Sequence, residues 1–333
     1  MRRTPSSAVT PRSQPVVQRV TGAAGTARTV HSALLVLACV LACSCAVLGP
    51  ATAAADDEPR PAWSRKITAR VGFAQNALSN WEAGGTSSVA WTWLLETELA
   101  HRGRRHDWQN DIALEYGLVK QQGEDLRKSV DRIELETVYT RRLDYYVEPY
   151  AAASARTQFA LGRDYGVDVD PDDPDFEFPE TSRFADPLYL SQSLGVGRQF
   201  NEELRSRFGF SVREIITENF RRYGCTDEER EAIEDVGTRD RACDPLRVDT
   251  GLESVTQYQR SFEERTSLRS RLKLFFSFEQ PDQLDVHWRN EFTTELLDFV
   301  AFGFGLEMLY DKNVRDQLQI KQVMTIGLVM TLD

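Results

Sequence analysis

The stretch Val89-Ala-Trp-Thr-Trp-Leu-Leu-Glu-Thr-Glu-Leu99 decides the fold, because its apolar and polar side chains alternate with a period of two. One face carries Val89, Trp91, Trp93, Leu95 and Leu99, and the other carries Thr86, Ser88, Thr92, Glu96 and Glu98. Residues 318–332 alternate in the same way. A strand of a soluble sandwich has about 5–6 residues, whereas a membrane-spanning strand needs about 9–11 with one apolar face. The pattern therefore predicts an all-β chain that folds as a transmembrane antiparallel up-and-down β-barrel.

The same alternation continues after residue 62 and predicts about twelve strands. They lie near 63–76, 86–101, 107–121, 129–143, 145–159, 187–200, 204–222, 246–262, 265–278, 284–296, 299–310 and 317–332. Single-chain bacterial barrels have an even number of strands, which brings both chain ends to the periplasmic side. Aromatic residues concentrate near the strand ends, where the interfacial girdles of membrane barrels lie. They are Trp91, Trp108, Tyr145, Tyr258, Trp288 and Tyr310.

The connections between the predicted strands alternate in length, as short periplasmic turns and longer outer loops do. The short ones are Arg102–His106, Asp144, Asn201–Glu203, Glu263–Glu264 and Leu297–Asp298. The longer ones include Ala77–Gly85, Gln122–Lys128, Ala160–Asp186 and Tyr223–Pro245. In the seventh strand Phe208, Phe210 and Val212 alternate until Glu214 intervenes. We therefore expect the second half of that strand to project above the membrane.

The N-terminus has the layout of a secretory signal. Residues 1–55 contain five arginines and no acidic residue. The arginines come first, the apolar run Ala33–Leu48 follows, and small residues lead up to Ala55. We predict cleavage after Ala55, which leaves residues 56–62 as a short periplasmic segment and 63–333 as the barrel. A membrane anchor is disfavoured because the apolar run is shorter than the roughly 20 residues a spanning helix needs. Lipidation of Cys43 is disfavoured because Leu41, two residues before it, is not small.

Composition and cysteine content narrow the classes further. Residues 56–333 hold 35 basic and 51 acidic residues, a net charge of −16 that argues against a nucleic-acid partner. Cys225 and Cys243 are the cysteines that remain after export, and both lie in one polar segment. An oxidising compartment favours a disulfide between them. By the chain-entropy estimate, a disulfide that closes this loop would stabilise the folded chain by about 3 kcal/mol.

The inward faces of the predicted strands are charged, and the charge is uneven. The second to fourth strands direct mainly acids inward, namely Glu96, Glu98, Asp111, Glu115, Glu134 and Glu136, with Arg132 among them. The seventh to ninth strands direct mainly cations inward, namely Arg205, Arg207, Arg213, Arg269, Arg271 and Lys273, with Glu253 between them. The tenth strand adds Asp285, His287, Arg289, Glu291 and Glu295. A structural network that fills a small barrel and a narrow polar conduit with a transverse field both fit this pattern.

The sequence offers no set of catalytic residues, so we expect a protein that is not an enzyme and needs no cofactor. His101 and His106 flank a predicted turn, and His287 points inward beside acids. Gly-x-Ser-x-Gly, His-Glu-x-x-His and phosphate-loop motifs are missing from the sequence. The acidic loop 168–175 places oxygen ligands at alternate positions, as Ca²⁺ prefers. It lacks the glycine and glutamate of an EF-hand, however, so we predict a solvated outer loop and no metal site.

Several short motifs resemble a bacterial family of uncharacterised outer-membrane β-barrels, domain of unknown function 3078. The first is Ser79-Asn80-Trp81-Glu-Ala-Gly84-Gly85, which follows the first predicted strand. The others are Tyr116-Gly117-Leu118 and Lys128-Ser129-Val130-Asp131-Arg132-Ile133-Glu134. The likeness covers residues 67–160 and implies a barrel in the outer membrane without implying an activity. The chain departs from the usual terminal aromatic residue of such barrels, because it ends in Met330-Thr-Leu-Asp333.

Two functions remain open at this point. One is a narrow channel or uptake component for small polar solutes. The other is a structural or surface-binding barrel whose lumen is plugged by charge and whose outer loops do the work. Both imply outer-membrane lipids and the barrel insertion machinery as partners.

Overall fold

The structure is a computed structural model that describes residues 63–76, 87–143, 145–167, 177–262, 265–281, 284–311 and 315–332. The predicted signal peptide, segment 56–62, the Asn80-Trp81 and Gly84-Gly85 motif and the acidic loop 168–175 lie outside the described residues. None of the helices in the described ranges is long and apolar enough to cross a membrane.

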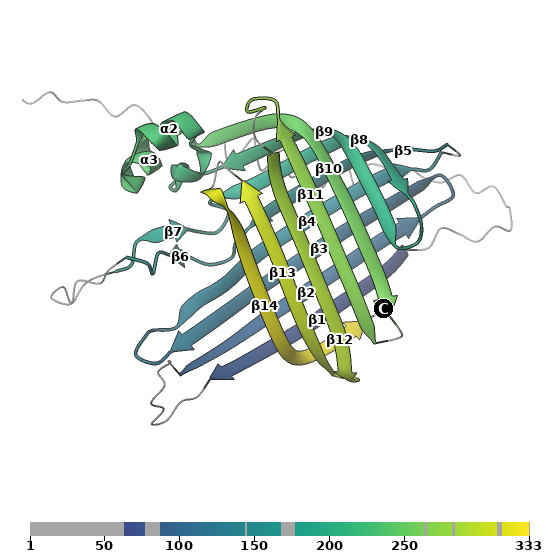
Figure 1. Cartoon of the computed structure of the whole chain (residues 1–333), viewed down its shortest axis with the longest axis horizontal. Helices are drawn as coiled ribbons and strands as arrows, with labels where there is room; N and C mark the ends of the chain where they lie inside the picture. Colours follow the sequence, from purple (N-terminus) through teal and green to yellow (C-terminus); the bar gives the residue numbers. More distant parts are fainter. Residues whose placement is uncertain are drawn as a thin grey trace, which may run out of the picture. The chain divides into compact units, whose positions relative to one another are not determined.

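Within the described residues, twelve long antiparallel strands close into one barrel (Figure 1). They are β1 (Trp63–Asn76), β2 (Ser88–Arg102), β3 (His106–Gln121), β4 (Arg127–Arg141), β5 (Glu148–Thr157), β8 (Leu188–Gln199), β9 (Leu204–Ile216), β10 (Leu246–Phe262), β11 (Thr266–Ser277), β12 (Leu284–Leu297), β13 (Val300–Asp311) and β14 (Arg315–Leu332). Each pairs with its neighbour along the chain, and β1 pairs with β14 to close the circle. The predicted fold class and strand number are confirmed.

Two predicted strands differ from the observed ones. The predicted strand 145–159 begins at Glu148, and Tyr145 lies in the preceding turn with 81% of its surface exposed. The predicted strand 204–222 ends at Ile216, so its predicted end is wrong and residues 217–222 belong to the following connection. The next amides bond elsewhere: Thr217 N–H donates to the Pro245 carbonyl, and those of Glu218 and Asn219 donate to the Asp186 carboxylate. Because these donors leave the sheet ladder, the strand ends there.

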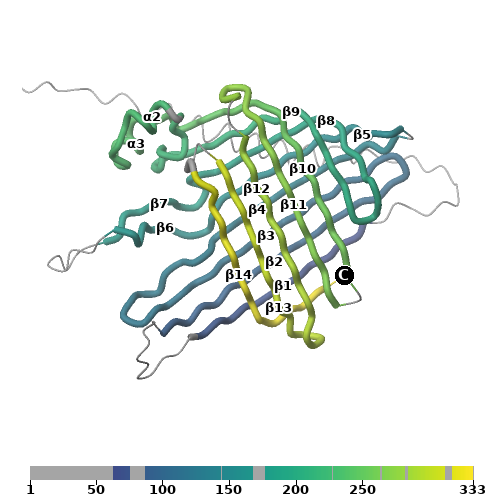
Figure 2. The backbone as a smooth tube through the Cα atoms, in the orientation of Figure 1, coloured from purple at the N-terminus to yellow at the C-terminus, as the bar shows by residue number. Residues whose placement is uncertain are grey.

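The two longest connections contain structure that the sequence pattern did not predict. Strands β6 (Gly162–Arg163) and β7 (Glu180–Ser182) form a small separate sheet in the connection after β5. The connection after β9, residues 217–245, holds η1 (Arg221–Gly224), α2 (Asp227–Ala232) and α3 (Val236–Ala242). The tube in Figure 2 shows both connections at the same end of the barrel.

The connection after β9 is tied together by a disulfide and by helix caps. The predicted Cys225–Cys243 bond is present, with 5.1 Å between the Cα atoms and both residues buried. Thr226 and Glu229 form a reciprocal capping box at the start of α2. Nη1 of Arg247, on the inward face of β10, donates to the Cys225 carbonyl at 2.8 Å. This connection, which we call the disulfide loop, is therefore fixed to the barrel rim.

The barrel has its polar side inside. Cross-strand register places the charged residues of each strand on the lumen face and the large apolar residues on the outer face. On β2, for example, Glu96 and Glu98 point inward while Trp93 and Leu95 remain 43% and 39% exposed on the outside. The packed interior of the molecule is thus a charged lumen.

Candidate functional site

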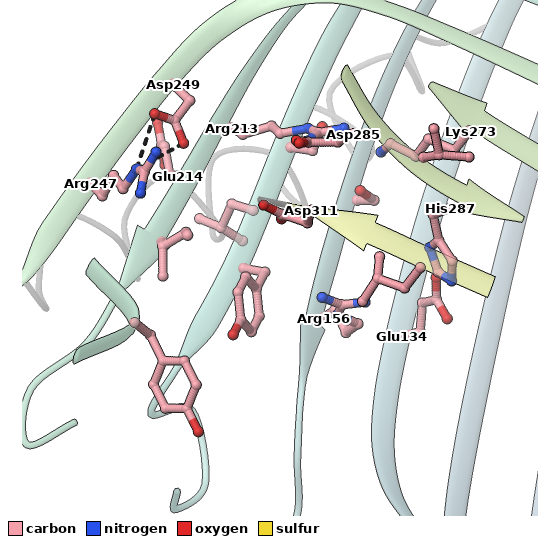
Figure 3. A pocket seen from close by; sticks show the side chains of 18 of the residues that line it. Glu134, Arg156, Arg213, Glu214, Arg247, Asp249, Lys273, Asp285, His287 and Asp311 are labelled. Atoms are coloured by element: carbon pink, nitrogen blue, oxygen red, sulfur yellow. Dashed lines mark hydrogen bonds and ion pairs between the residues drawn. The ribbon is translucent and has the colours of Figure 1, made fainter. Parts of the chain in front are cut away.

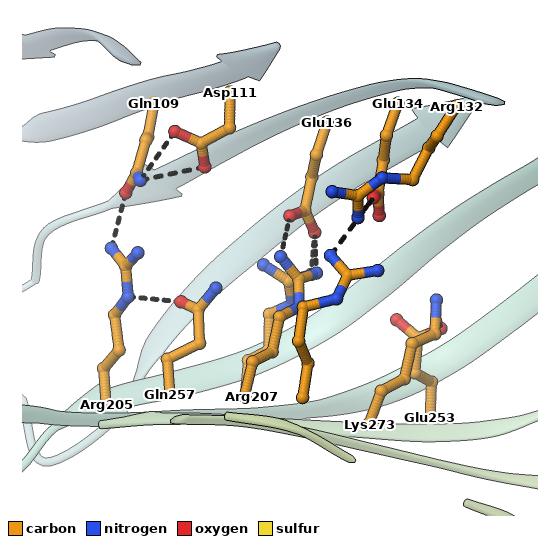
Figure 4. A network of polar contacts seen from close by, with 12 residues as sticks. Gln109, Asp111, Arg132, Glu134, Glu136, Arg205, Arg207, Glu253, Gln257 and Lys273 are labelled. Atoms are coloured by element: carbon orange, nitrogen blue, oxygen red, sulfur yellow. Dashed lines mark hydrogen bonds and ion pairs between the residues drawn. The ribbon is translucent and has the colours of Figure 1, made fainter. Parts of the chain in front are cut away.

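A layer of ion pairs crosses the middle of the lumen. The carboxylate of Glu136, on β4, accepts hydrogen bonds from Nη1 and Nη2 of Arg271, on β11, at 2.5 and 2.7 Å. It also accepts one from Arg207, on β9 (Figure 4). Because β11 lies nearly opposite β4 in the closed strand order and β9 lies between them, these contacts cross the lumen. Glu136 is 8% exposed, so its charge is held by two guanidinium groups away from bulk water.

Glu134 extends the same layer by one step along β4. Its Oε2 accepts from Arg132, two residues earlier on its own strand, at 3.0 Å and from Arg289, on β12, at 3.2 Å. The second guanidinium nitrogen of Arg289 donates to Glu307, on β13, at 3.2 Å. Glu307 also lies 2.6 Å from Nε2 of His287. These contacts link β4, β12 and β13 through one chain of polar groups.

Further pairs lie on each side of this layer. Toward the short turns, Arg269 contacts Glu98 at 2.8 Å across the lumen. Arg205 donates to Gln257 and to Gln109, each at 2.5 Å. Toward the long connections, pairs between strand residues are Lys273–Glu253 at 2.7 Å, Arg213–Asp285 at 2.8 Å and Arg247–Asp249 at 3.0 Å.

Two cavities enter the lumen from its two ends. The loop-side cavity has a volume of about 440 Å³, and its wall includes Arg156, Tyr189, Arg213 and Asp285 from the strands and Arg222, Tyr223, Arg230 and Arg239 from the disulfide loop (Figure 3). The turn-side cavity has a volume of about 930 Å³, and its wall includes Lys66, Glu98, Gln109, Arg205 and Arg269. Glu134, Glu136, Arg271 and Arg289 belong to the walls of both cavities. We call these four residues the shared layer.

The loop-side wall contains a titratable group outside the strands whose pKa is shifted. Burial raises the pKa of the Tyr223 phenol above its usual range. Tyr223 therefore stays neutral at any physiological pH and gives the cavity a hydrogen-bonding group without a charge.

The structure places the predicted lumen residues at inward positions and brings most of them together. Glu96 pairs with Arg70 at 3.4 Å and Glu115 with Arg132 at 3.1 Å, while both carboxylate oxygens of Asp111 accept from the Gln109 amide. Glu291 lines the turn-side cavity. Among the described residues no group of three or more His, Cys, Asp and Glu side chains could hold a metal ion.

Sequence reasoning missed several lumen residues that the structure reveals, namely Arg70, Gln109, Arg156 and Glu307. The period-two alternation of β13 could have identified Glu307, because Glu307 lies between Gly305 and Leu309 on the inward face of that strand. Arg156 lies near the end of an Ala- and Ser-rich strand in which alternation is weak. Its position on β5 opposite Glu134 depends on a register that the sequence does not specify clearly.

Fold and lumen together define the class of protein: a closed twelve-stranded antiparallel barrel with an apolar outer face and a charged interior. Residues 73–162 match the model of a protein family of unknown function, DUF3078. The resemblance noted from the motifs is therefore confirmed over this part of the chain.

Solved structures similar to the chain are bacterial barrels. The translocator domain of the autotransporter NalP from Neisseria meningitidis has 10% identity and a TM-score of 0.37, covering 82% of this chain and 89% of that one. The COG4313 outer membrane channel from Pseudomonas putida F1 has 11% identity and a TM-score of 0.35, covering 84% and 99%. OprB of Pseudomonas putida has 7% identity and a TM-score of 0.29, covering 81% and 94%. No curated protein matches the chain.

Part of the family motif has a structural role at the loop-side rim. A Cβ atom on Gly117 would lie only 2.7 Å from Cγ1 of Val130 and 2.8 Å from Oγ of Ser129, at the bulge between β3 and β4. Two residues beyond Ser129, the buried Asp131 carboxylate accepts from the amides of Phe159 and Ala160 and pairs with Lys128 at 2.8 Å. These motif residues therefore fix where the chain leaves β5.

Proposed function

We propose that this chain is an outer-membrane β-barrel that conducts small polar solutes through a narrow, charged lumen, with its long connections on the cell surface. Exposed apolar side chains support the membrane placement: Phe208, Phe210 and Met324 are 52%, 45% and 59% exposed on the outer face. Soluble monomers rarely expose so continuous an apolar surface. The predicted export signal supports the same destination, since outer-membrane barrels are exported chains that cross the membrane with strands.

One observation supports conduction above all others: the two cavities approach the same four side chains from opposite ends. A lumen filled along its whole length would separate its two ends by several layers of side chains. Here the shared layer of Glu134, Glu136, Arg271 and Arg289 lines both cavities, so a single level of side chains lies between the two walls at these positions.

The shared layer also sets what passes. Its acids come from β4, and its cations come from β11 and β12 on the other side of the lumen. A path between facing charges of opposite sign carries a transverse field, which orients polar solutes and slows those without polar groups. The narrow gap limits passage to small solutes.

Planar-bilayer recording tests this function, with Arg271→Ala and Arg269→Ala as a matched pair. Both residues stand on β11 and point inward, and each contacts an acid of the opposite wall, Glu136 or Glu98. Arg271 belongs to the shared layer, whereas Arg269 lines the turn-side cavity. We expect native barrels to conduct in small steps and Arg271→Ala to raise the unit conductance several-fold. Arg269→Ala should stay close to native.

A closed barrel that binds ligands at the cell surface is the second candidate. The contacts of Glu136 with both Arg207 and Arg271 favour it, because they close the middle of the lumen. If neither the native protein nor Arg271→Ala conducts, the conducting function is refuted and this candidate replaces it. The same conductance change in both variants would show that the shared layer is not the barrier.

A further inference from the structure

The loop-side cavity carries an excess of positive charge in a chain that is acidic overall. Among the described residues, nine arginines and lysines and six acids line it, although the whole chain has a formal net charge of −11. Most of these cations have a carboxylate partner or a carbonyl partner. Arg213 pairs with Asp285, and Arg239 donates to the carbonyls of Ile233 and Arg230.

Arg156 differs from these cations. Within the described residues it forms no hydrogen bond or ion pair, and its guanidinium stacks on the ring of Tyr189 with 4.8 Å to the ring centroid. Its cross-strand neighbour Glu134 is already engaged, since Oε2 accepts from Arg132 and Arg289. The donors of Arg156 therefore face the cavity. Figure 3 shows Arg156 in the cavity wall together with Glu134 and His287.

The contact with the Tyr189 ring restricts the positions that the guanidinium group can take. Arg156 and Tyr189 are also cross-strand partners on β5 and β8, so the backbone register fixes the pair. A guanidinium that is stacked on one face keeps its edge free, and that edge presents parallel N–H donors matched to carboxylate and phosphate oxygens. The cavity volume of about 440 Å³ lies within the range of small-molecule sites.

From this geometry we infer that the loop-side cavity is a binding site for small oxyanions, with the Arg156–Tyr189 stack as its anchor. The inference deepens the proposed function, on which it rests for access from the cell surface, by assigning anionic solutes as the class that enters. The oxyanion is a phosphate or a carboxylate, because the guanidinium edge binds both in the same way. The remaining cations of the wall raise the local concentration of such anions before they reach Arg156.

Calorimetric titration of the purified barrel in zwitterionic detergent tests the site without requiring conduction. The probes are inorganic phosphate and succinate, which separate phosphate from carboxylate recognition. We expect saturable binding of at least one probe to the native protein. Loss of a charge-assisted contact is worth about 1.5–3 kcal/mol, so Arg156→Gln should weaken binding by at least about tenfold.

Arg205→Gln is the matched control, because it makes the same change in the turn-side cavity, where Arg205 contacts two glutamines. Binding at native strength is expected for this variant. Arg156→Lys, which keeps the charge and loses the fork, should bind with intermediate strength and serves if the glutamine variant does not fold. The inference is overturned if native protein binds neither probe, if Arg156→Gln binds as native does, or if Arg205→Gln weakens binding equally.

The result is separable from the test of conduction. Phosphate or succinate binding that depends on Arg156 in a barrel that does not conduct would refute the channel and keep the oxyanion site. Conduction without such binding would refute the site and keep the channel.

Discussion

The two cavities of the lumen are built from the same barrel and differ in charge. The loop-side cavity is lined by nine cations and six acids, and the turn-side cavity by eight cations and nine acids. The difference comes from the disulfide loop, which contributes Arg222, Arg230 and Arg239 to the loop-side wall. Without these three residues the strands alone would give that wall equal numbers of both signs. In this barrel the strands therefore supply a balanced polar lumen, and the disulfide loop gives the loop-side wall its excess of cations.

The largest expected effect concerns the shared layer that separates the two cavities. Glu136→Ala leaves the inward cations Arg207 and Arg271 without their carboxylate. Removing one partner from a buried pair costs about 3–5 kcal/mol, so the free energy of unfolding should fall by that amount. Urea titration of the barrel in lipid vesicles measures it. Glu98→Ala, at a pair whose glutamate side chain is 37% exposed, should cost less than about 1 kcal/mol. Equal losses in the two variants would contradict the central role of the layer.

The second expected effect is confined to the loop-side end. Replacing Cys225 and Cys243 together by serine removes a cross-link that is worth about 3 kcal/mol to the loop, so its open state becomes on the order of a hundredfold more populated. Trypsin cleavage after Arg222 or Arg239 should accelerate accordingly, because cleavage follows the population of the open form. Cleavage after Arg205, at the turn-side end, should keep its native rate. Acceleration at both ends would mean that the disulfide stabilises the whole barrel.

The third effect tests the charge difference between the two cavities directly. Arg239→Gln removes one positive charge of the disulfide loop and keeps an amide that can donate to the Ile233 carbonyl. A unit charge about 8 Å from an ion in water changes its energy by about 0.5 kcal/mol, roughly a twofold change in local concentration. Reversal potentials in asymmetric KCl should therefore show about a twofold lower preference for chloride. Arg205→Gln in the turn-side cavity makes the same charge change, and an equal shift in that variant would argue against a loop-determined selectivity.

How much of this could be predicted depends on which interactions are local. The period-two pattern of Val89–Leu99 specifies inside and outside at once, so barrel, strand number and the inward acids and cations follow from the sequence. The end of β9 cannot be predicted from the sequence, because Ile216 is followed by residues whose amides bond to Asp186, thirty residues before Ile216.

The two short helices of the disulfide loop, in contrast, could have been predicted from local sequence. Thr226 followed by Glu229 is a capping box, and Asp235 followed by Thr238 is an N-cap, so both short helices of the disulfide loop have sequence signatures. Arg156 had no such signal, since it is distinguished by forming no hydrogen bond or ion pair within the described residues and by its contact with the ring of Tyr189. Whether a charged side chain finds a partner depends on contacts between distant strands, which the sequence alone does not specify.

The smallest expected effect is a pH dependence limited to the disulfide loop. Asp235 caps α3 by accepting from the hydroxyl and the amide of Thr238, and these hydrogen bonds lower the pKa of its carboxyl. A lowered folded-state pKa means that the cap stabilises the loop fully above the unfolded value of about 3.9. That stabilisation is lost as the pH falls through the folded pKa. Hydrogen exchange of α3, corrected for the intrinsic rate, should rise a few-fold below about pH 4, while exchange of the turn after β8 stays unchanged. Asp235→Asn keeps the cap without a titrating group, so its α3 should show no such rise, and a rise in that variant would assign the pH effect to another group of the loop.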